Sequence, residues 1–183
     1  MLIINIPANN DLWDERNEIF ITTKEVKAVT LEHSLVSLSK WESKWHKPFF
    51  TKGEKTNIES LDYIRCMTIT PSDIDPLCYL GIPSHTIDTI HKYIEDSMTA
   101  TTFSKDEHKV TNREIVTAEI IYYYMITLNI PFECQKWHLN RLLTLINVCN
   151  LKNQKPKALS QSETIARNRA LNAERKARLN TKG

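Results

Sequence analysis

The sequence predicts an α+β protein that is mainly helical, with a small N-terminal β-hairpin or sheet. Only three of the 183 residues are glycine, which argues against a loop-rich or all-β fold. Apolar residues make up 41% of the chain, which is enough for a hydrophobic core. Helix-start signals, in which Thr or Ser precedes Glu by three positions, occur at Thr56, Thr111 and Ser160. We therefore predict a mostly helical body over residues 1–150 and a linker with a basic helical tail over residues 151–183.

The predicted β-structure lies in the first 31 residues. Leu2–Ile6 and Glu18–Thr22 are short runs rich in β-branched or aromatic residues, which is typical of strands. Glu25–Leu31 fits either a third strand or the entry to a helix. Asn9–Asn17 places Trp13 among charged and polar residues, so we expect a loop there.

Apolar residues at helical spacing predict the first helices of the body, at Glu32–His46, Asn57–Met67 and Ser84–Glu95. In the first helix, Glu42 is expected on the solvated side. In the second, Ile58 is expected to face the core. Prolines and a glycine between the second and third helices leave room for at most one helical turn.

Residues Thr111–Asn150 are predicted to form a helix hairpin in the middle of the core. The first helix, which Thr111 caps and Asn129 ends, is apolar nearly all round and is therefore expected to be buried. Pro131 opens the second helix, whose leucines fall on one side.

Two details of the predicted hairpin concern polar side chains. The run Tyr122–Tyr124 points three ways around a helix, so we expect most of it in the core with hydroxyls at the rim. Glu119 and Arg141 fall near the two apolar faces and are predicted to pair, unless one of them pairs with Glu133 or Lys136.

Candidate chemistry in the chain is sparse. Cys134 and His138 are four residues apart on one predicted helix, a spacing that can present two metal ligands. A structural zinc needs four ligands, and no Cys-x-x-Cys or His-x-x-x-His pair supplies the others. The sequence also lacks the nucleophile-elbow, Walker, dinucleotide and zincin motifs. We therefore expect no enzyme activity, no cofactor, no metal and no catalytic residue.

Neither a secretory signal nor a membrane-spanning segment is apparent in the sequence. The longest apolar run, around Ile120, is shorter than the roughly 20 residues that a membrane-spanning helix needs. The four cysteines are scattered without the spacing of a disulfide framework. These observations predict a reduced cytosolic protein that has no membrane partner.

The charge is divided unevenly along the chain. After residue 150 there are nine Lys or Arg residues against two Glu, a net charge of +7, whereas the first 150 residues carry fifteen basic and twenty acidic residues, a net charge of −5. The tail is a solvated terminus, a nucleic-acid arm or a partner-binding segment that folds on docking. It has no aromatic residue for stacking on bases, which favours a protein partner. The candidate partner-binding residues are Lys155, Lys157, Arg167, Arg169, Arg175, Lys176 and Arg178.

A helix-turn-helix interpretation of Pro131–Val148 keeps nucleic acid open as a second, less favoured partner. Its second helix would present a thin basic face of Lys136, His138, Asn140 and Arg141.

Several blocks of the chain resemble a family of tailed-bacteriophage proteins. These blocks are Leu31–Trp45 (LEHSLVSLSKWESKW), Leu61–Thr70, Met98–Phe103, Glu119–Ile146 and Arg167–Gly183. Members of the family are commonly labelled tail assembly chaperones or minor virion components. The resemblance implies a non-enzymatic assembly protein of the host cytoplasm that binds a tail component, such as the tape measure protein, or another virion protein. The alternatives are a minor structural component of the virion, or a DNA-binding regulator or packaging factor.

Overall fold

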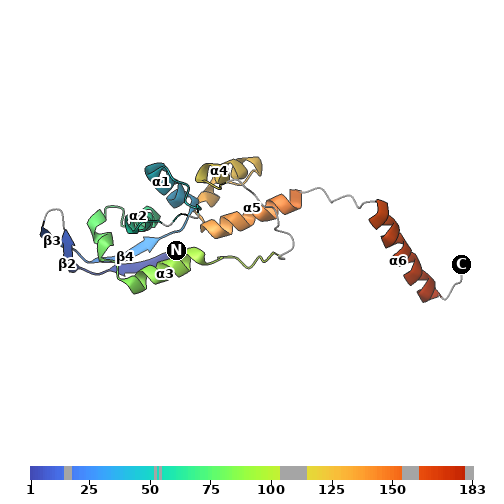
Figure 1. Cartoon of the computed structure of the whole chain (residues 1–183), viewed down its shortest axis with the longest axis horizontal. Coiled ribbons are helices and arrows are strands. Elements are labelled where there is room, and N and C mark those ends of the chain that lie inside the picture. The colour runs from blue at the N-terminus through green and yellow to red at the C-terminus, as the bar shows by residue number, and fades with distance from the viewer. Residues whose placement is uncertain (15–17, 52, 54, 104–114, 154–160, 180–183) are drawn as a thin grey trace. The chain divides into compact units, whose positions relative to one another are not determined.

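The computed structural model describes residues 1–14, 18–51, 53, 55–103, 115–153 and 161–179. The chain divides into two compact units, Met1–Cys149 and Asn150–Gly183. The first unit is α+β, with helices and a small antiparallel sheet formed mainly by the N-terminal segment (Figure 1). The predicted helix starts at Thr111 and Ser160 lie outside the described residues.

One sheet has the strand order β1 (Leu2–Ile6), β4 (Val26–Leu31), β5 (Thr68–Thr70), and neighbouring strands run antiparallel. Alternation along β1 places Ile4 and Ile6 on the buried face, whereas Ile3 is 66% exposed on the other face. The strand β5 was not predicted from the sequence, because three residues are too few to show the alternation of apolar and polar residues that is typical of a strand.

The strands β2 (Asn9–Asp14) and β3 (Ile19–Thr23) form a separate antiparallel hairpin. The expectation of a loop was therefore wrong over Asn9–Asp14, and residues 15–17 lie outside the described residues. Trp13 lies opposite Phe20, with the ring centroids 4.9 Å apart in an edge-to-face arrangement. Cross-strand pairing of this kind stabilises a strand whose Asn and Asp content alone disfavours β-structure.

The helices α2 (Asn57–Met67) and α3 (Ser84–Glu95) have the predicted bounds, and α1 (Leu35–Trp45) begins three residues later than predicted. The 3₁₀ helix η1 (Pro76–Gly81) has six residues, about two turns, so the expectation of at most one turn was wrong. The capping box at α2 is confirmed, because Thr56 and Glu59 each accept a hydrogen bond from the backbone of the other. Ile58 is 68% exposed, so its expected burial was wrong.

Among the described residues, the buried apolar side chains form two clusters. The first cluster lies between the buried face of the β1-β4-β5 sheet and the helices α1, α2, η1 and α3. The second cluster gathers α1 with α4 (Ala118–Thr127), the 3₁₀ helix η3 (Phe132–Lys136) and α5 (Leu139–Asn153). Trp41 belongs to the first cluster and Leu38 to the second, so α1, rather than the predicted hairpin, is the element that both clusters share.

The second helix of the predicted hairpin is interrupted. The chain forms η3, breaks at Trp137 and His138, and starts α5 at Leu139. Cys134 and His138 therefore do not share a helix, and the metal-ligand spacing inferred from the sequence does not apply. The predicted stop at Asn129 is confirmed, because this residue adopts a left-handed conformation with φ of 53° just after α4.

The helix α4 is apolar nearly all round, yet only one of its faces is buried. Ala118, Ile121 and Met125 face the core, whereas Tyr123 and Ile126 are 63% and 62% exposed. The expected burial of the tyrosine run was therefore wrong for its central residue. Helix α4 packs against α1 and joins the second cluster, while its Tyr123 and Ile126 side chains stay open to solvent.

Glu42 is buried rather than solvated, which corrects the expectation from the sequence. Its carboxylate accepts a hydrogen bond from the Phe49 backbone N–H at 2.7 Å and one from the Ala118 backbone N–H at 2.7 Å. Ala118 is the first residue of α4, and the side chain of Thr117 does not cap this helix. Glu42 therefore serves as a distant N-terminal cap, where its negative charge also favours the positive end of the helix dipole.

The predicted pairing of Glu119 with Arg141 was wrong. No ion pair joins Glu119 or Arg141 to another charged group within the part of the chain that the structure describes. The guanidinium of Arg141 instead lies 4.2 Å from the ring centroid of Trp137, a cation–π contact.

In the second unit, α6 (Gln161–Leu179) has no buried side chain among its described residues. Its alanines are exposed together with its charged residues. None of the described helices has the length and apolar character needed to cross a membrane.

We expect Glu42→Ala to lower the free energy of unfolding by about 2–3 kcal/mol, because two buried backbone N–H groups lose a charged acceptor. Glu119→Ala on the exposed face of α4 is the matched control and should stay within about 0.5 kcal/mol of wild type. Urea unfolding followed by circular dichroism measures both values. Equal stabilities of the two variants would contradict the capping role of Glu42.

Candidate functional site

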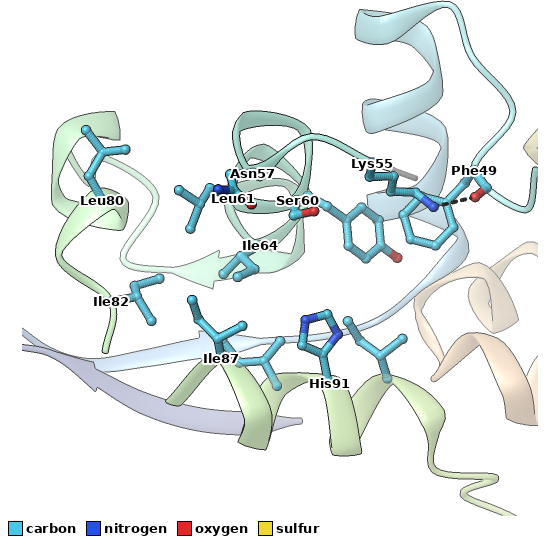
Figure 2. A pocket seen from close by; sticks show the side chains of 13 residues that line it. Phe49, Lys55, Asn57, Ser60, Leu61, Ile64, Leu80, Ile82, Ile87 and His91 are labelled. Carbon is cyan, nitrogen blue, oxygen red and sulfur yellow. Dashed lines mark hydrogen bonds between the residues drawn. The ribbon is translucent and has the colours of Figure 1, made fainter. Parts of the chain in front are cut away.

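The candidate site is an apolar groove between α2 and α3, closed at one end by η1. We call it the α2–α3 groove (Figure 2), and its volume is about 500 Å³. It is lined by Phe49, Lys55, Asn57, Ser60, Leu61, Tyr63, Ile64, Leu80, Ile82, Ile87, Ile90, His91 and Ile94.

The walls of the α2–α3 groove are aliphatic because two helices turn apolar residues toward the same space. Ile87, Ile90 and Ile94 recur at helical spacing on α3, so they form a ridge along the groove. Leu61 and Ile64 do the same from α2, as Figure 2 shows. Ile90 is buried, whereas Ile87 and Ile94 are half-buried and remain accessible.

One end of the groove carries a cation in contact with aromatic rings. The Lys55 ammonium donates a hydrogen bond to the Phe49 carbonyl oxygen at 2.8 Å and lies 4.2 Å from the centroid of the Phe49 ring (Figure 2). Burial lowers the pKa of Lys55, while attraction to Glu59 acts in the opposite direction. The ring of Tyr63 packs against that of Phe49, with 4.2 Å between centroids.

The polar groups that line the α2–α3 groove come from Lys55, Asn57, Ser60, Tyr63 and His91. Among the described lining residues there is neither a thiol nor a carboxylate, and Lys55 already bonds to a backbone carbonyl. Leu80 lies on η1, at the end of the groove that η1 closes, and its side chain is 44% exposed. An open groove with aliphatic walls and few polar groups suits the apolar side chains of another helix.

The basic residues predicted to bind a partner belong to the second unit of the chain. The exposed surface of α6 carries Arg167, Arg169, Arg175, Lys176 and Arg178. Lys155 and Lys157 lie outside the described residues. The sequence identified the apolar stripe of α3 but missed the groove, since no local pattern says that α2 stands opposite α3 across an open space.

The thin basic face predicted for a helix-turn-helix is largely occupied by internal contacts. His138 is buried, and Arg141 contacts Trp137. The Asn140 amide donates hydrogen bonds to the carbonyl oxygens of Ile94 at 2.9 Å and Asp96 at 2.7 Å. Of the four residues, Lys136 retains a side chain that no described group engages, so the structure does not support readout of DNA by this segment.

A second group of titratable residues, which we call the polar junction, surrounds residues 32–34. The Glu32 carboxylate accepts a hydrogen bond from the Tyr93 hydroxyl at 2.6 Å and forms an ion pair with the Met1 amino group at 3.1 Å. The His33 Nδ1 atom shares a hydrogen bond of 2.6 Å with the Tyr63 hydroxyl. The His138 Nε2 atom donates to the Tyr93 carbonyl oxygen at 3.0 Å.

The histidines of the polar junction are held in the neutral state. Burial lowers the pKa of His33 to about 3, and the neighbouring His138 acts in the same direction. Burial also lowers the pKa of His138, although the hydrogen bond to the Tyr93 carbonyl opposes this shift. The two rings are in edge-to-face contact, with 5.1 Å between centroids.

The polar junction joins elements of the fold. The Leu139 N–H donates to the His33 carbonyl oxygen at 2.7 Å, and Ser34 forms an isolated β-bridge with His138. Over the described parts of the chain, no group of three or more His, Cys, Asp or Glu side chains is arranged to hold a metal ion. We therefore interpret the polar junction as a structural element.

The chain was compared with known protein families, curated proteins and solved structures. No protein family matches the chain, and no curated protein or solved structure matches it.

The polar junction makes stability depend on pH. The native His33 pKa lies near 3, below the value of about 6.5 for an unfolded chain, so below pH 6.5 the unfolded state binds a proton that the native state does not. Stability is therefore complete above pH 6.5 and is lost as the pH falls toward 3. Between pH 7 and pH 5 we expect a loss of about 2 kcal/mol from His33.

Urea unfolding at a series of pH values measures this loss. His33→Gln removes the titrating ring and should flatten the curve between pH 7 and pH 5. His91→Gln changes an exposed histidine and should leave the slope as in wild type. A His33→Gln slope equal to the wild-type slope would show that His33 does not cause the acid sensitivity.

Proposed function

We propose that this chain is a non-enzymatic bacteriophage assembly protein that binds an apolar helix of a tail component, such as the tape measure protein, in the α2–α3 groove. The observation that supports this proposal is the groove itself, whose aliphatic walls remain open to solvent. Contiguous apolar surface of this kind marks interaction sites in proteins that are otherwise well packed. The block resemblance to phage tail proteins supports the class of partner.

A long helical tail component would present a suitable ligand before assembly. A helix that later joins a coiled coil carries an apolar stripe, and this stripe is exposed to water until its partner helices arrive. The ridge of Ile87, Ile90 and Ile94 offers apolar side chains at the spacing of the same helical period, so it can interdigitate with such a stripe. Binding in the groove would keep the stripe from aggregating.

In the proposed function, the basic helix α6 assists binding of the partner. All its described side chains are exposed, so its cations are accessible to a partner. Arginine and lysine side chains on an exposed helix attract acidic partners over several ångströms, and this accelerates association more than it strengthens the final complex.

We expect Leu80→Glu to weaken binding of the tail component by about 30-fold, since a carboxylate on the η1 wall of the groove is desolvated against aliphatic side chains. Ile3→Glu makes the same kind of change on the exposed sheet face and should bind like wild type. Co-purification of tail proteins with each tagged variant from infected cells, quantified by mass spectrometry, gives the comparison. Failure of wild type to recover a tail protein would contradict the function, and retention by Leu80→Glu would contradict the groove.

Deletion of residues 161–183 should leave the melting temperature of the first unit unchanged within about 2 °C, because the described α6 side chains are all exposed. The same deletion should slow association with the tail component, and raised salt should remove the difference from wild type. Calorimetry and stopped-flow mixing measure the two effects. A large fall in melting temperature would mean that α6 packs in the core.

A further inference from the structure

We propose that a second groove, between α1 and β5, binds an acidic and extended segment of a protein partner. This α1–β5 groove has a volume of about 730 Å³ and is lined by one face of α1, the end of α2, β5 and the residues that follow β5, together with Met1, Glu32, Ser34 and Lys136. The Glu32 carboxylate is already paired with the Met1 amino group at 3.1 Å. It shares no lining residue with the α2–α3 groove, so the two sites can be tested independently.

The rim of the α1–β5 groove is cationic. Lys40 and Lys44 are four residues apart and therefore lie on the same face of α1, while Arg65 comes from α2 and Lys136 from η3. Lys44 and Arg65 both contact the Asp62 carboxylate, at 2.6 Å and 2.8 Å. Lys40 and Lys136 have no anionic partner among the described residues. The rim therefore has positive charge in excess of what the fold itself uses.

The floor of the α1–β5 groove is apolar. Ile69 is 44% exposed, and Val36, Ile74 and Cys66 are half-buried around it. A ligand that complements both features carries carboxylates for the rim and aliphatic side chains for the floor. This combination describes an amphipathic acidic peptide segment.

The strand β5 adds a reason for an extended ligand. The strand order β1-β4-β5 leaves β5 at the edge of its sheet, and Thr68 and Ile69 line the groove. Edge strands carry backbone groups on which an extended segment can add main-chain hydrogen bonds. Alternate side chains of such a segment would then point toward the floor and toward the cationic rim.

The same groove is less suited to nucleic acid. Tyr79, the aromatic residue among its described lining, is 3% exposed, and its hydroxyl is hydrogen-bonded to Thr68 at 2.8 Å. Single-stranded nucleic acids are held by stacking on open aromatic rings, which this floor does not offer.

Fluorescence anisotropy tests the inference with three labelled probes. These are a short peptide of alternating Glu and Val, the same peptide with Lys in place of Glu, and an oligothymidylate. We expect the acidic peptide to bind with an affinity that falls as salt rises. The double variant Lys40→Glu/Lys136→Glu should weaken this binding by about tenfold or more, whereas Lys24→Glu/Lys92→Glu, which changes net charge equally on other exposed lysines, should not.

Cysteine alkylation locates the bound peptide on the same protein. The acidic peptide should protect Cys66, which lines the groove, from N-ethylmaleimide, and should leave Cys149 on α5 as reactive as before. Burial raises the pKa of the Cys66 thiol, so the reaction is run at mildly alkaline pH. Both double variants are first checked for an unchanged melting temperature.

The outcomes separate clearly. Preferential binding of the acidic peptide, loss in the Lys40→Glu/Lys136→Glu variant and protection of Cys66 would support the inference. It would be overturned by failure of the acidic peptide to bind, by equal loss in both double variants, or by groove-dependent binding of the oligothymidylate alone. None of these results depends on whether the α2–α3 groove binds a tail protein.

Discussion

The fold depends on the set of buried hydrogen bonds that the chain makes as it leaves β4. Glu32, His33 and Ser34 lie where the two apolar clusters meet, and their partners come from α2, α3 and the start of α5. A buried polar group destabilises the protein unless it is hydrogen-bonded, so α2, α3 and the start of α5 must all pack in place for these residues to be satisfied. Their positions in turn fix the two grooves, because α2 and α3 form the walls of one, and the end of α2 with α1 forms the other.

Helices with strong local signals could be predicted well from the sequence. The box formed by Thr56 and Glu59 starts α2 at the predicted residue, and apolar spacing identified α3 over its whole length. These features depend on residues within one or two helical turns, which the sequence displays directly. The resulting fold class, α+β with an N-terminal sheet, follows from such signals together with composition.

Features that depend on distant residues could not be predicted in the same way. Glu42 looked like a solvated charge because its two backbone partners are seven and seventy-six positions away. Tyr123 looked buried because the composition of α4 does not reveal that neighbours cover only one of its sides. The candidate site shows the same limit: the isoleucines of α3 were visible as a stripe, but a groove exists only once α2 stands opposite. The basic tail could be identified because its charge is read directly from the sequence, whereas an open apolar surface is formed only by tertiary packing.

The block Leu31–Trp45 uses most of its polar side chains inside the molecule, among them Glu32, His33 and Glu42. Selection on such a block acts through the integrity of the body. A second protein with the same block would therefore share this architecture and be free to differ in the molecule it recognises. Recognition would diverge instead at exposed positions, of which Leu80 and Lys40 are examples. Under the two binding proposals, variation at those two positions among homologous sequences should be more informative about partner choice than identity across the block.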